Sequence, residues 1–360
     1  MIEQSEIVTS LASANGIYFN IPSLDEYAKK ITAHGKSVDF RQPDTGKLIA
    51  YALYYDNAPE IFISMVWTHP EYRGRGFAKA LLRQIINSSH KDIRLEVHRD
   101  NPFRLLYERL GFTVEEEFIG SLYMRFRRKA AIMQPYVFPY IGYFQLIDAS
   151  DLFVFYDDVH FIKKGWINRN RILLNGRDHL FTVPVADASQ NRRINETHLS
   201  IDEKWRSAFY KTMTQAYRKA PYFSKVMDQI LPIFHAEYES VADMAINSIA
   251  SVYDYLGMKH SFAKSSVCAP ATRELNKSDR LIEITKRHGY KGYVNAASGR
   301  HLYSTDYFKT QGVELSYIKS EPIQYTQLAD EFVPGLSIID AMMFNDAETL
   351  KTFFGQYSIE

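Results

Sequence analysis

The chain has 360 residues, and its 43 basic and 42 acidic side chains leave a formal net charge of +1. At about 100 to 200 residues per domain, this length predicts two domains. The balanced charge argues against the strong overall positive potential that is typical of proteins that bind nucleic acids or membrane surfaces. The single cysteine, Cys268, excludes an internal disulfide framework and a Cys-rich metal cluster. No apolar run approaches the about 18 residues of a membrane span, and residues 1–20 lack the pattern of a secretory leader, so we expect a cytoplasmic protein without membrane contact.

Residues 1–128 predict a first domain of α/β type. In chain order, the predicted elements are a helix over 24–33, a hairpin of strands over 37–41 and 47–55, a strand over 61–67, a helix over 78–87, a strand around 95–97, a helix over 102–110 and a strand over 118–126. Hydrophobic spacing indicates the helices and strands, and Asp44-Thr45-Gly46 is typical of a turn between hairpin strands.

A loop rich in glycine and arginine follows the strand over 61–67. It consists of Arg73, Gly74, Arg75, Gly76, Phe77 and Ala78. Its small residues let consecutive backbone N–H groups approach one anion, the next helix adds the positive end of its dipole, and the two arginines add formal charge. Apolar residues then recur at helical spacing and give that helix one buried face: Leu81, Leu82, Ile85 and Ile86. The pattern predicts a pyrophosphate-binding loop.

The order of these elements is similar to that of a known family. A strand, the loop Arg-x-x-Gly-x-Ala, a helix, a strand and a second helix ending in Leu-Tyr-Glu-Arg-Leu-Gly-Phe resembles the GNAT acetyltransferases. The resemblance implies the GNAT fold, which is a mixed, mostly antiparallel sheet with helices, and acetyl-CoA (acetyl-coenzyme A) as the cofactor on the loop. It also implies further cofactor contacts from Val66, Trp67, Thr68 and Asn101.

Two residues of this domain are candidates for proton transfer. By resemblance to ribosomal-protein N-terminal acetyltransferases, Glu96 would take the ammonium proton and Tyr107 would protonate coenzyme A. Strand alternation points Glu96 away from its neighbours Leu95 and Val97. The alternatives are an exposed strand carboxylate for Glu96, with His98 as the reserve base, and core packing for Tyr107.

A short basic hinge, Arg127 to Lys129, leads into a second domain over 129–360. Its predicted elements are a strand over 130–135, loops and short strands to 185, a helical section over 205–256, a helix over 279–288, a strand over 290–295, a helix over 305–310 and a strand over 313–318. The alternation of helices and strands in the last part indicates α/β layering.

Two motifs mark this domain. An aromatic, proline-containing loop over 134–144 precedes a polar stretch over 156–170. Together with the segment 275–280, Asn295 and Arg300, they resemble the WbqC-like family, which is found among genes for bacterial O-antigen and other surface polysaccharides. The resemblance covers nearly all of residues 131–350, and it implies an α/β domain, with a helical middle section, that transfers a glycyl group to amino sugars.

The stretch Asp157 to Arg171 carries unlike charges that would be costly to bury unpaired. One interpretation is a solvated turn with Trp166 plugging the core. The other, which we favour because the resemblance is concentrated here, is a polar pocket in which Lys and Arg bind diphosphate oxygens and Asp158 or His160 transfers a proton. The expected substrate-binding residues are Gln134, Tyr136, Tyr140, Asp157, Lys163, Trp166, Asn168, Arg169, Asn170, Ser278, Asp279, Arg280, Asn295 and Arg300.

Other chemistry is less consistent with the sequence. Asp157, Asp158 and His160 could ligate a metal, but such a loop without a partner motif is more typical of a salt-bridged surface, so no metal is expected. Cys268 fits a small buried hydrophobe better than a nucleophile. Because the full phosphate-loop motif Gly-x-x-x-x-Gly-Lys-Ser/Thr is absent, we expect glycine to arrive already activated, with glycyl-tRNA as the donor.

We expect the two domains to act in one pathway. The WbqC-like domain would place a glycyl group on the amine of a dTDP- or UDP-linked dideoxy amino sugar, and the acetyltransferase domain would cap the new glycyl amine. One alternative is direct acetylation of a nucleotide amino sugar, with the second domain as a sugar-binding module. Another is a protein N-terminal acetyltransferase whose second domain is a docking module.

Overall fold

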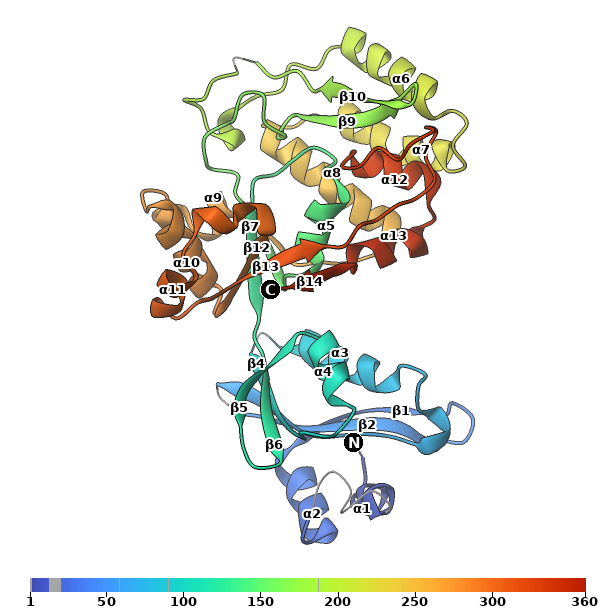
Figure 1. Ribbon diagram of the computed structural model, residues 1–360, viewed down its shortest axis with the longest axis vertical. Helices are drawn as coiled ribbons and strands as arrows, with labels where there is room; N and C mark the ends of the chain where they lie inside the picture. Colours follow the sequence, from blue (N-terminus) through green and yellow to red (C-terminus); the bar gives the residue numbers. More distant parts are fainter. Residues whose placement is uncertain (1, 13–20, 58, 90, 187) are drawn as a thin grey trace. The chain divides into compact units, whose positions relative to one another are not determined.

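The computed structural model describes residues 2–12, 21–57, 59–89, 91–186 and 188–360. The chain divides into two units, Met1–Arg128 and Lys129–Glu360, and each has its own sheet and hydrophobic clusters (Figure 1). None of the helices in the described ranges is long and apolar enough to cross a membrane.

The first unit contains a six-stranded sheet in the order β1-β2-β3-β4-β6-β5. Its strands are β1 (Lys36–Arg41), β2 (Leu48–Asp56), β3 (Glu60–Thr68), β4 (Asp92–His98), β5 (Phe112–Glu117) and β6 (Ser121–Phe126). β3 and β4 are parallel, whereas the other neighbours are antiparallel. The sheet is therefore mixed and mostly antiparallel, which confirms the expected architecture.

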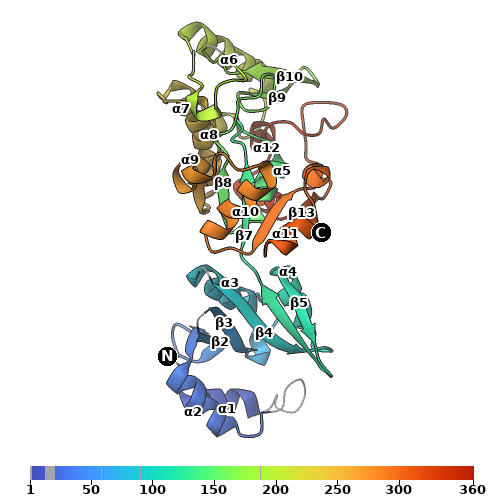
Figure 2. The ribbon, with the colours of Figure 1, turned by 90° about the vertical axis from the view of Figure 1, so that its left-hand side faces the viewer.

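Helices cover both faces of this sheet. They are α1 (Gln4–Ala12), α2 (Leu24–His34), α3 (Phe77–Ser88) and α4 (Arg104–Arg109). Because side chains alternate along a strand, Ala52 of β2 packs in the cluster with α3 and α4, while its neighbours Tyr51 and Leu53 pack in the cluster with α1 and α2. The two helix pairs lie on opposite sides of the sheet in Figure 2.

The structure departs from the predicted elements of this unit at two places. α1 was not predicted, and residues 118–126 form part of a hairpin of β5 and β6 rather than one strand. Gly120, with a φ of +82°, lies in the connecting turn, where glycine is the residue that adopts this conformation without strain. β5 is an edge strand that ends in three glutamates, so it lacks the apolar alternation that predicts a strand.

The second unit is built on a six-stranded sheet in the order β11-β8-β7-β12-β13-β14. Its strands are β7 (Lys129–Met133), β8 (Leu152–Phe155), β11 (Phe262–Lys264), β12 (Gly292–Ala296), β13 (Glu314–Ser320) and β14 (Tyr357–Ile359). The first five strands in this order are parallel, and β14 is antiparallel to β13. In chain order the parallel strands are arranged third, second, first, fourth, fifth, so the direction of winding reverses between β7 and β12.

Helices cover both faces of the second sheet. α5 (Ile141–Asp148), α8 (Val241–Leu256) and α13 (Ala347–Phe354) pack in one hydrophobic cluster, and α10 (Lys277–Arg287) and α11 (Thr305–Thr310) pack in another. Figure 1 shows these two groups on opposite sides of β7, β12 and β13. The fold is therefore a doubly wound α/β sheet, and such sheets bind ligands at the carboxyl ends of the strands where the winding reverses.

The predicted helical section over 205–256 is divided into three helices. They are α6 (Glu203–Tyr217), α7 (Phe223–His235) and α8. A two-stranded sheet of β9 (Arg169–Leu174) and β10 (Arg177–Thr182) precedes them, and α12 (Ile338–Phe344) follows late in the chain. The short helix α9 (Ser265–Cys268) directly follows β11.

Candidate functional site

The parallel strands β3 and β4 separate along their length. They pair only from Glu60 to Ile63 on β3 and from Asp92 to Leu95 on β4, although β3 continues to Thr68 and β4 to His98. An extra residue, Ser64, interrupts the register of β3 with β2, where Leu53 faces Met65 and Tyr54 faces Ile63. A bulge of this kind bends a strand. The last residues of β3 therefore keep backbone groups that β4 does not bind, next to the loop that follows.

The loop over 73–78 is open to a ligand. Gly74 and Gly76 have φ angles of +75° and +84°, and a Cβ on either glycine would meet nothing within 4 Å. Gly76 is the N-cap of α3 and provides no side-chain hydrogen bond to the first turn, so the N–H groups of this turn remain available. Arg73 and Arg75 are exposed beside them. Open N–H groups at a helix start, flanked by arginines, form an anion-binding site.

Thr68 lies at the end of β3, before this loop. The residue is 6% exposed, and its hydroxyl has no hydrogen-bond partner in the part of the chain that the structure describes. Its carbonyl accepts from Arg73 Nε at 3.4 Å. The side chains of Val66 and Trp67 pack instead in the two clusters on either face of the sheet. These two residues therefore offer backbone groups, not side chains, to a ligand.

Glu96 and Tyr107 lie on opposite faces of β4. Leu95 and Val97 are buried and Glu96 between them is exposed, as alternation predicted. The negative charge of Glu96 raises the pKa of Tyr123, its cross-strand neighbour on β6. Tyr107 is 8% exposed within the cluster that holds Leu95, and burial raises its pKa.

The remaining residues expected near the cofactor have local contacts. The oxygen of the Asn101 side chain accepts from the backbone N–H of Phe103 at 3.0 Å, which fixes the turn into α4. His98 Nδ1 accepts from the backbone N–H of Asp100 at 3.2 Å, so this nitrogen is engaged in a turn.

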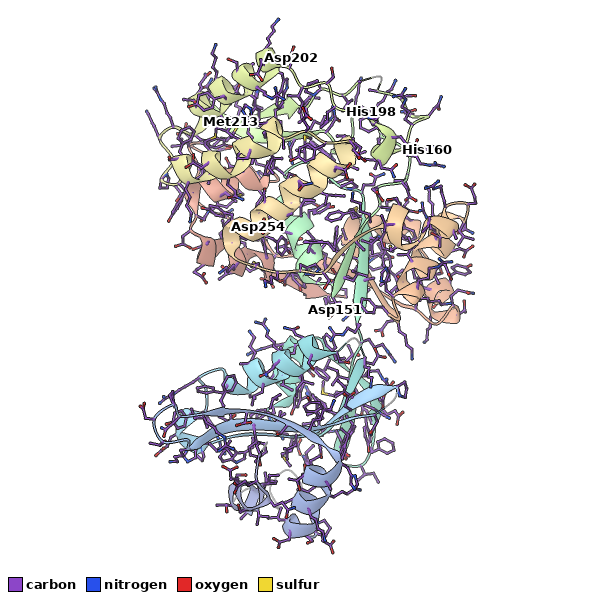
Figure 3. All side chains as sticks on the ribbon, turned by 180° about the vertical axis from the view of Figure 1, so that it is seen from behind. Asp151, His160, His198, Asp202, Met213 and Asp254 are labelled. Atoms are coloured by element: carbon purple, nitrogen blue, oxygen red, sulfur yellow. The ribbon has the colours of Figure 1, made fainter. Side chains whose placement is uncertain are left out.

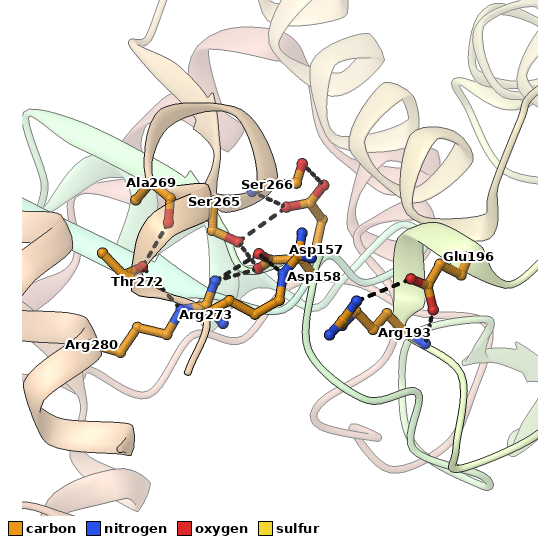
Figure 4. Close-up of polar contacts among 10 residues, drawn as sticks. All are labelled: Asp157, Asp158, Arg193, Glu196, Ser265, Ser266, Ala269, Thr272, Arg273 and Arg280. Carbon is orange, nitrogen blue, oxygen red and sulfur yellow. Dashed lines mark hydrogen bonds and ion pairs between the residues drawn. The ribbon is translucent and has the colours of Figure 1, made fainter. Parts of the chain in front are cut away.

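Two carboxylates lie at the carboxyl end of β8 in the second unit (Figure 4). Asp157 accepts from Ser265 Oγ at 3.0 Å and, through both of its oxygens, from the N–H and Oγ of Ser266 at 3.0 and 2.6 Å. Asp158 accepts from Ser265 Oγ at 2.5 Å and from Arg280 Nη2, which lies 2.7 Å from each carboxylate oxygen. These contacts tie β8 to α9 and α10.

This carboxylate cluster is a buried structural feature. The Asp158 side chain is 0% exposed and that of Arg280 is 3% exposed. Burial alone would raise the pKa of Asp158, but hydrogen bonds from Ser265 and Arg280 outweigh it and hold this pKa below its usual value. A carboxylate fixed in this way is poorly placed to exchange a proton, so the geometry favours a positioning role for Asp158 over the proton transfer that the sequence indicated.

His160 does not join the carboxylates. Its side chain is exposed at the surface (Figure 3), and its backbone forms an isolated bridge with Arg193. Among the described residues, no hydrogen bond links its imidazole to Asp157 or Asp158. No group of three or more His, Cys, Asp or Glu side chains within the described ranges is arranged to hold a metal ion.

An aromatic pocket of 280 Å³ lies beside the polar stretch. Its lining residues are Tyr136, Pro139, Tyr140, Trp166, Asn170, Arg171 and Gly335. Trp166 is 42% exposed and Tyr140 is 43% exposed. The interpretation of Trp166 as a core plug is therefore wrong, because its ring borders an open pocket.

Arg169 and Arg171 flank Trp166, and each guanidinium carbon lies 5.6 Å from the ring centroid. Arg169 also donates to the carbonyls of Gly165 and Lys164, so two of its donors hold the preceding turn. Arg171 lines the pocket itself.

The other expected substrate-binding residues do not form one site. Asn168 donates to the Val183 carbonyl at 2.7 Å, and the Asn295 side chain accepts from its neighbour Ala296 at 2.8 Å. Arg300 pairs with Glu360 at 2.7 Å. Four of the others lie apart from the pocket: Gln134 follows β7, Lys163 is exposed, and Ser278 and Asp279 lie in the first turn of α10.

Several residues of these sites carried no signal in the sequence. Ser265 and Ser266 bind the carboxylates but stand 107 to 109 positions away along the chain. Gly335 contributes its backbone to the pocket from a distant loop. Arg171 could have been predicted as a pocket residue, because it is the last residue of the charged stretch that contains Trp166.

The first sheet, with its separated parallel pair and open loop, defines an enzyme of the acyltransferase class, and a doubly wound α/β unit follows it. The chain belongs to the WbqC-like protein family, whose family model matches residues 134–352, and residues 12–112 match the acetyltransferase (GNAT) family. Both resemblances drawn from the sequence are thereby confirmed.

Individual relatives match part of the chain. The uncharacterized protein Rv1507c of Mycobacterium tuberculosis is 29% identical over 224 residues, which are 61% of this chain and 94% of the relative. The human cysteine-rich protein 2-binding protein is 40% identical over 58 residues, which are 16% of this chain and 7% of the relative.

Two solved structures are similar to part of the chain. The ribosomal-protein-S18-alanine N-acetyltransferase from Escherichia coli is 24% identical with a TM-score of 0.27, over 32% of this chain and 86% of that one. Arabidopsis thaliana NAA60 in complex with acetyl-CoA is 18% identical with a TM-score of 0.29, over 34% of this chain and 92% of that one.

Proposed function

We propose that the first unit is an acetyl-CoA-dependent N-acetyltransferase. The observation that carries this proposal is the coincidence of two features: β3 separates from β4, and the Gly76-capped loop with open N–H groups begins directly afterwards. The loop would bind the pyrophosphate, and the free edge of β3 at 66–68 would hold the arm that leads to the thioester. The absence of any atom near a Cβ at position 74 or 76 is consistent with room for that group.

Glu96 and Tyr107 would serve as the base and the acid of the reaction. Acetyl-CoA supplies the acetyl thioester. Glu96 takes a proton from the substrate ammonium, directly or through water, so that the neutral nitrogen bonds to the carbonyl carbon. As the carbon–sulfur bond breaks, Tyr107 gives its phenolic proton to the sulfur, and the nitrogen loses its second proton, which returns through water to the phenolate. A phenol is protonated at neutral pH, so Tyr107 carries this proton until the thiolate departs.

We propose that the second unit transfers a glycyl group to the amine of a dTDP- or UDP-linked dideoxy amino sugar in O-antigen or other surface-polysaccharide biosynthesis. Membership of the WbqC-like family supports the substrate class, and the aromatic pocket supports a ligand that contains a ring. The first unit would then acetylate the new glycyl amine. An α-amine has a pKa of about 8, so at neutral pH it is more often uncharged than a lysine amine. This difference favours glycyl transfer before acetylation.

Glycyl-tRNA is the donor in this proposal. The chain has no complete phosphate loop for activating glycine with ATP. The tripeptide Gly35-Lys36-Ser37 shares the end of that motif, but Gly35 joins α2 to β1, and Lys36 and Ser37 begin that strand. A phosphate loop instead leads into the N-terminus of a helix.

Mass spectrometry of the sugar product tests the proposal. The full chain is incubated with acetyl-CoA, glycyl-tRNA, UDP- or dTDP-linked amino sugars and peptides with free N-termini. We expect an added acetylglycyl group. An added acetyl group alone would support direct acetylation of the sugar, and an unchanged sugar together with acetylated peptide N-termini would support a protein acetyltransferase.

A further inference from the structure

The loop from β7 to α5 holds a strained residue beside the aromatic pocket. Phe138 has a φ of +40°, a conformation that is unfavourable for a residue with a bulky side chain. Its N–H donates to Ser248 Oγ at 2.9 Å, and its carbonyl accepts from Ser337 Oγ at 2.6 Å and Asn170 Nδ2 at 2.7 Å. Three elements therefore fix one backbone position, which is typical of a preorganised site.

The strained residue sets the positions of its neighbours. Tyr136, Pro139 and Tyr140 lie on either side of Phe138 in the chain and all line the pocket. The carbonyl of Pro139 accepts from Ile338 N at 2.9 Å, which fixes the loop against α12. The pocket wall thus has a fixed shape without a bound ligand.

Arg171 forms the charged side of the pocket. Its Nη2 donates to the carbonyl of Gly335 at 3.1 Å, and its Nη1 lies 3.4 Å from Asp178 Oδ2. Its Nε is buried and has no acceptor among the residues that the structure describes. The guanidinium is therefore held beside the exposed ring of Trp166, and the Arg171 side chain is 34% exposed, so a ligand in the pocket can reach it.

The topology places this loop at the position where doubly wound sheets bind nucleotides. It is the first connection of the sheet, and it leaves β7 at the point where the winding reverses toward β12. The volume of 280 Å³ is close to the lower end of small-molecule pockets, about 300 Å³. The pocket therefore fits one ring-sized part of a larger ligand.

We propose that this pocket binds the nucleoside diphosphate part of a nucleotide-linked ligand. The base stacks on Trp166 and Tyr140, and the phosphates face Arg171, whose planar guanidinium suits phosphate oxygens. This inference rests on the proposed function of the second unit. It adds a defined pocket and assigns phosphate recognition to Arg171, in place of the Arg169 indicated by the sequence.

Isothermal titration calorimetry of the full chain with UDP, dTDP, ADP, uridine and inorganic pyrophosphate tests this inference. At least one nucleoside diphosphate should bind more tightly than uridine or pyrophosphate. Trp166→Ala and Arg171→Gln should each weaken that binding about ten-fold or more. Tyr210→Ala and Arg218→Gln change exposed side chains of α6 and its C-cap outside the pocket, and they should leave the affinity unchanged.

Two further variants keep the test independent of folding. Trp166→Phe should retain more affinity than Trp166→Ala, and Arg171→Lys more than Arg171→Gln, because ring and charge are partly preserved. The inference is overturned if no nucleoside diphosphate binds, or if Trp166→Ala and Arg171→Gln bind like the unaltered chain. If glycylated sugar forms without such binding, only the pocket is misassigned. If binding depends on both residues but no aminoacyl product forms, the pocket stands and the proposed function fails.

Discussion

Arg280 Nη2 lies 2.7 Å from each carboxylate oxygen of Asp158, and both side chains are buried. The two residues are 122 positions apart in the chain. Their pair joins the carboxyl end of β8 to the first turn of α10, with Ser265 of α9 as a third partner. Its contribution is therefore to hold the carboxyl edge of the second sheet in place.

Breaking this pair should destabilise the second unit strongly. Asp158→Asn leaves Arg280 buried without a counter-charge, and such a change costs about 3 to 5 kcal/mol. Chemical denaturation followed by circular dichroism measures the loss. Glu283→Gln is the matched control, because it removes the exposed Glu283–Arg287 pair of the same helix, and exposed pairs contribute about 0 to 1 kcal/mol. Equal effects of the two variants would show that the buried pair does not stabilise the fold.

The same pair gives a dependence on pH. The pKa of Asp158 is lower in the folded chain than the ordinary pKa of an aspartate, so the stability from ionised Asp158 is fully present above that ordinary value. It is lost as the pH falls through the folded pKa. Below about pH 4 the unaltered chain should therefore lose more stability than Asp158→Asn, which has no carboxyl to protonate.

Gly76→Trp should abolish coenzyme A binding. The indole would enter the open space at the loop and cover the N–H groups at the start of α3. Gly46→Trp is the matched control, because Gly46 also has a positive φ, +69°, and open space around it. Both variants carry a similar backbone strain of about 1 to 2 kcal/mol. Saturable binding to Gly76→Trp in calorimetry would mean that the loop is not the cofactor site.

Tyr107→Phe should lower the acetylation rate about ten-fold to a thousand-fold and leave coenzyme A affinity nearly unchanged. The variant removes only a proton donor, and such donors contribute about 10²- to 10⁴-fold. Steady-state kinetics measure the rate. Tyr54→Phe removes a hydroxyl from another buried tyrosine of the same cluster and should keep the normal rate. If Tyr107→Phe also keeps the normal rate, Tyr107 has a packing role.

Glu96→Gln should shift the pH–rate profile of acetylation to more alkaline values. Without the carboxylate, more of the substrate amine must lose its proton to solvent before it reacts. Glu116→Gln, on the edge strand β5 that pairs with β6, removes another glutamate of the same sheet and should leave the profile in place. An unshifted profile for Glu96→Gln would identify Glu96 as an ordinary exposed carboxylate.

The sequence predicted those parts of the structure that depend on local patterns. The buried stripe of α3 and the exposure of Glu96 between Leu95 and Val97 follow from helical and strand periodicity. The loop over 73–78 was identifiable because its glycines and arginines are consecutive.

Contacts between distant segments were not predictable from one sequence. Asp158 and Arg280 were both expected at a substrate site, but only the fold pairs them and buries them. Phe138 gave no indication of its positive φ, since three distant partners impose it. Trp166 could equally have been a core residue until its exposed fraction was known.

A comparison of two acceptor substrates tests whether acetylation follows glycyl transfer. The full chain is supplied with acetyl-CoA and, in parallel, with a nucleotide-linked amino sugar and its chemically prepared glycyl derivative. We expect a higher kcat/KM for acetylation of the glycyl derivative than for acetylation of the free amino sugar. A higher kcat/KM for the free amino sugar would contradict the sequential pathway and assign the first unit to direct acetylation of the sugar.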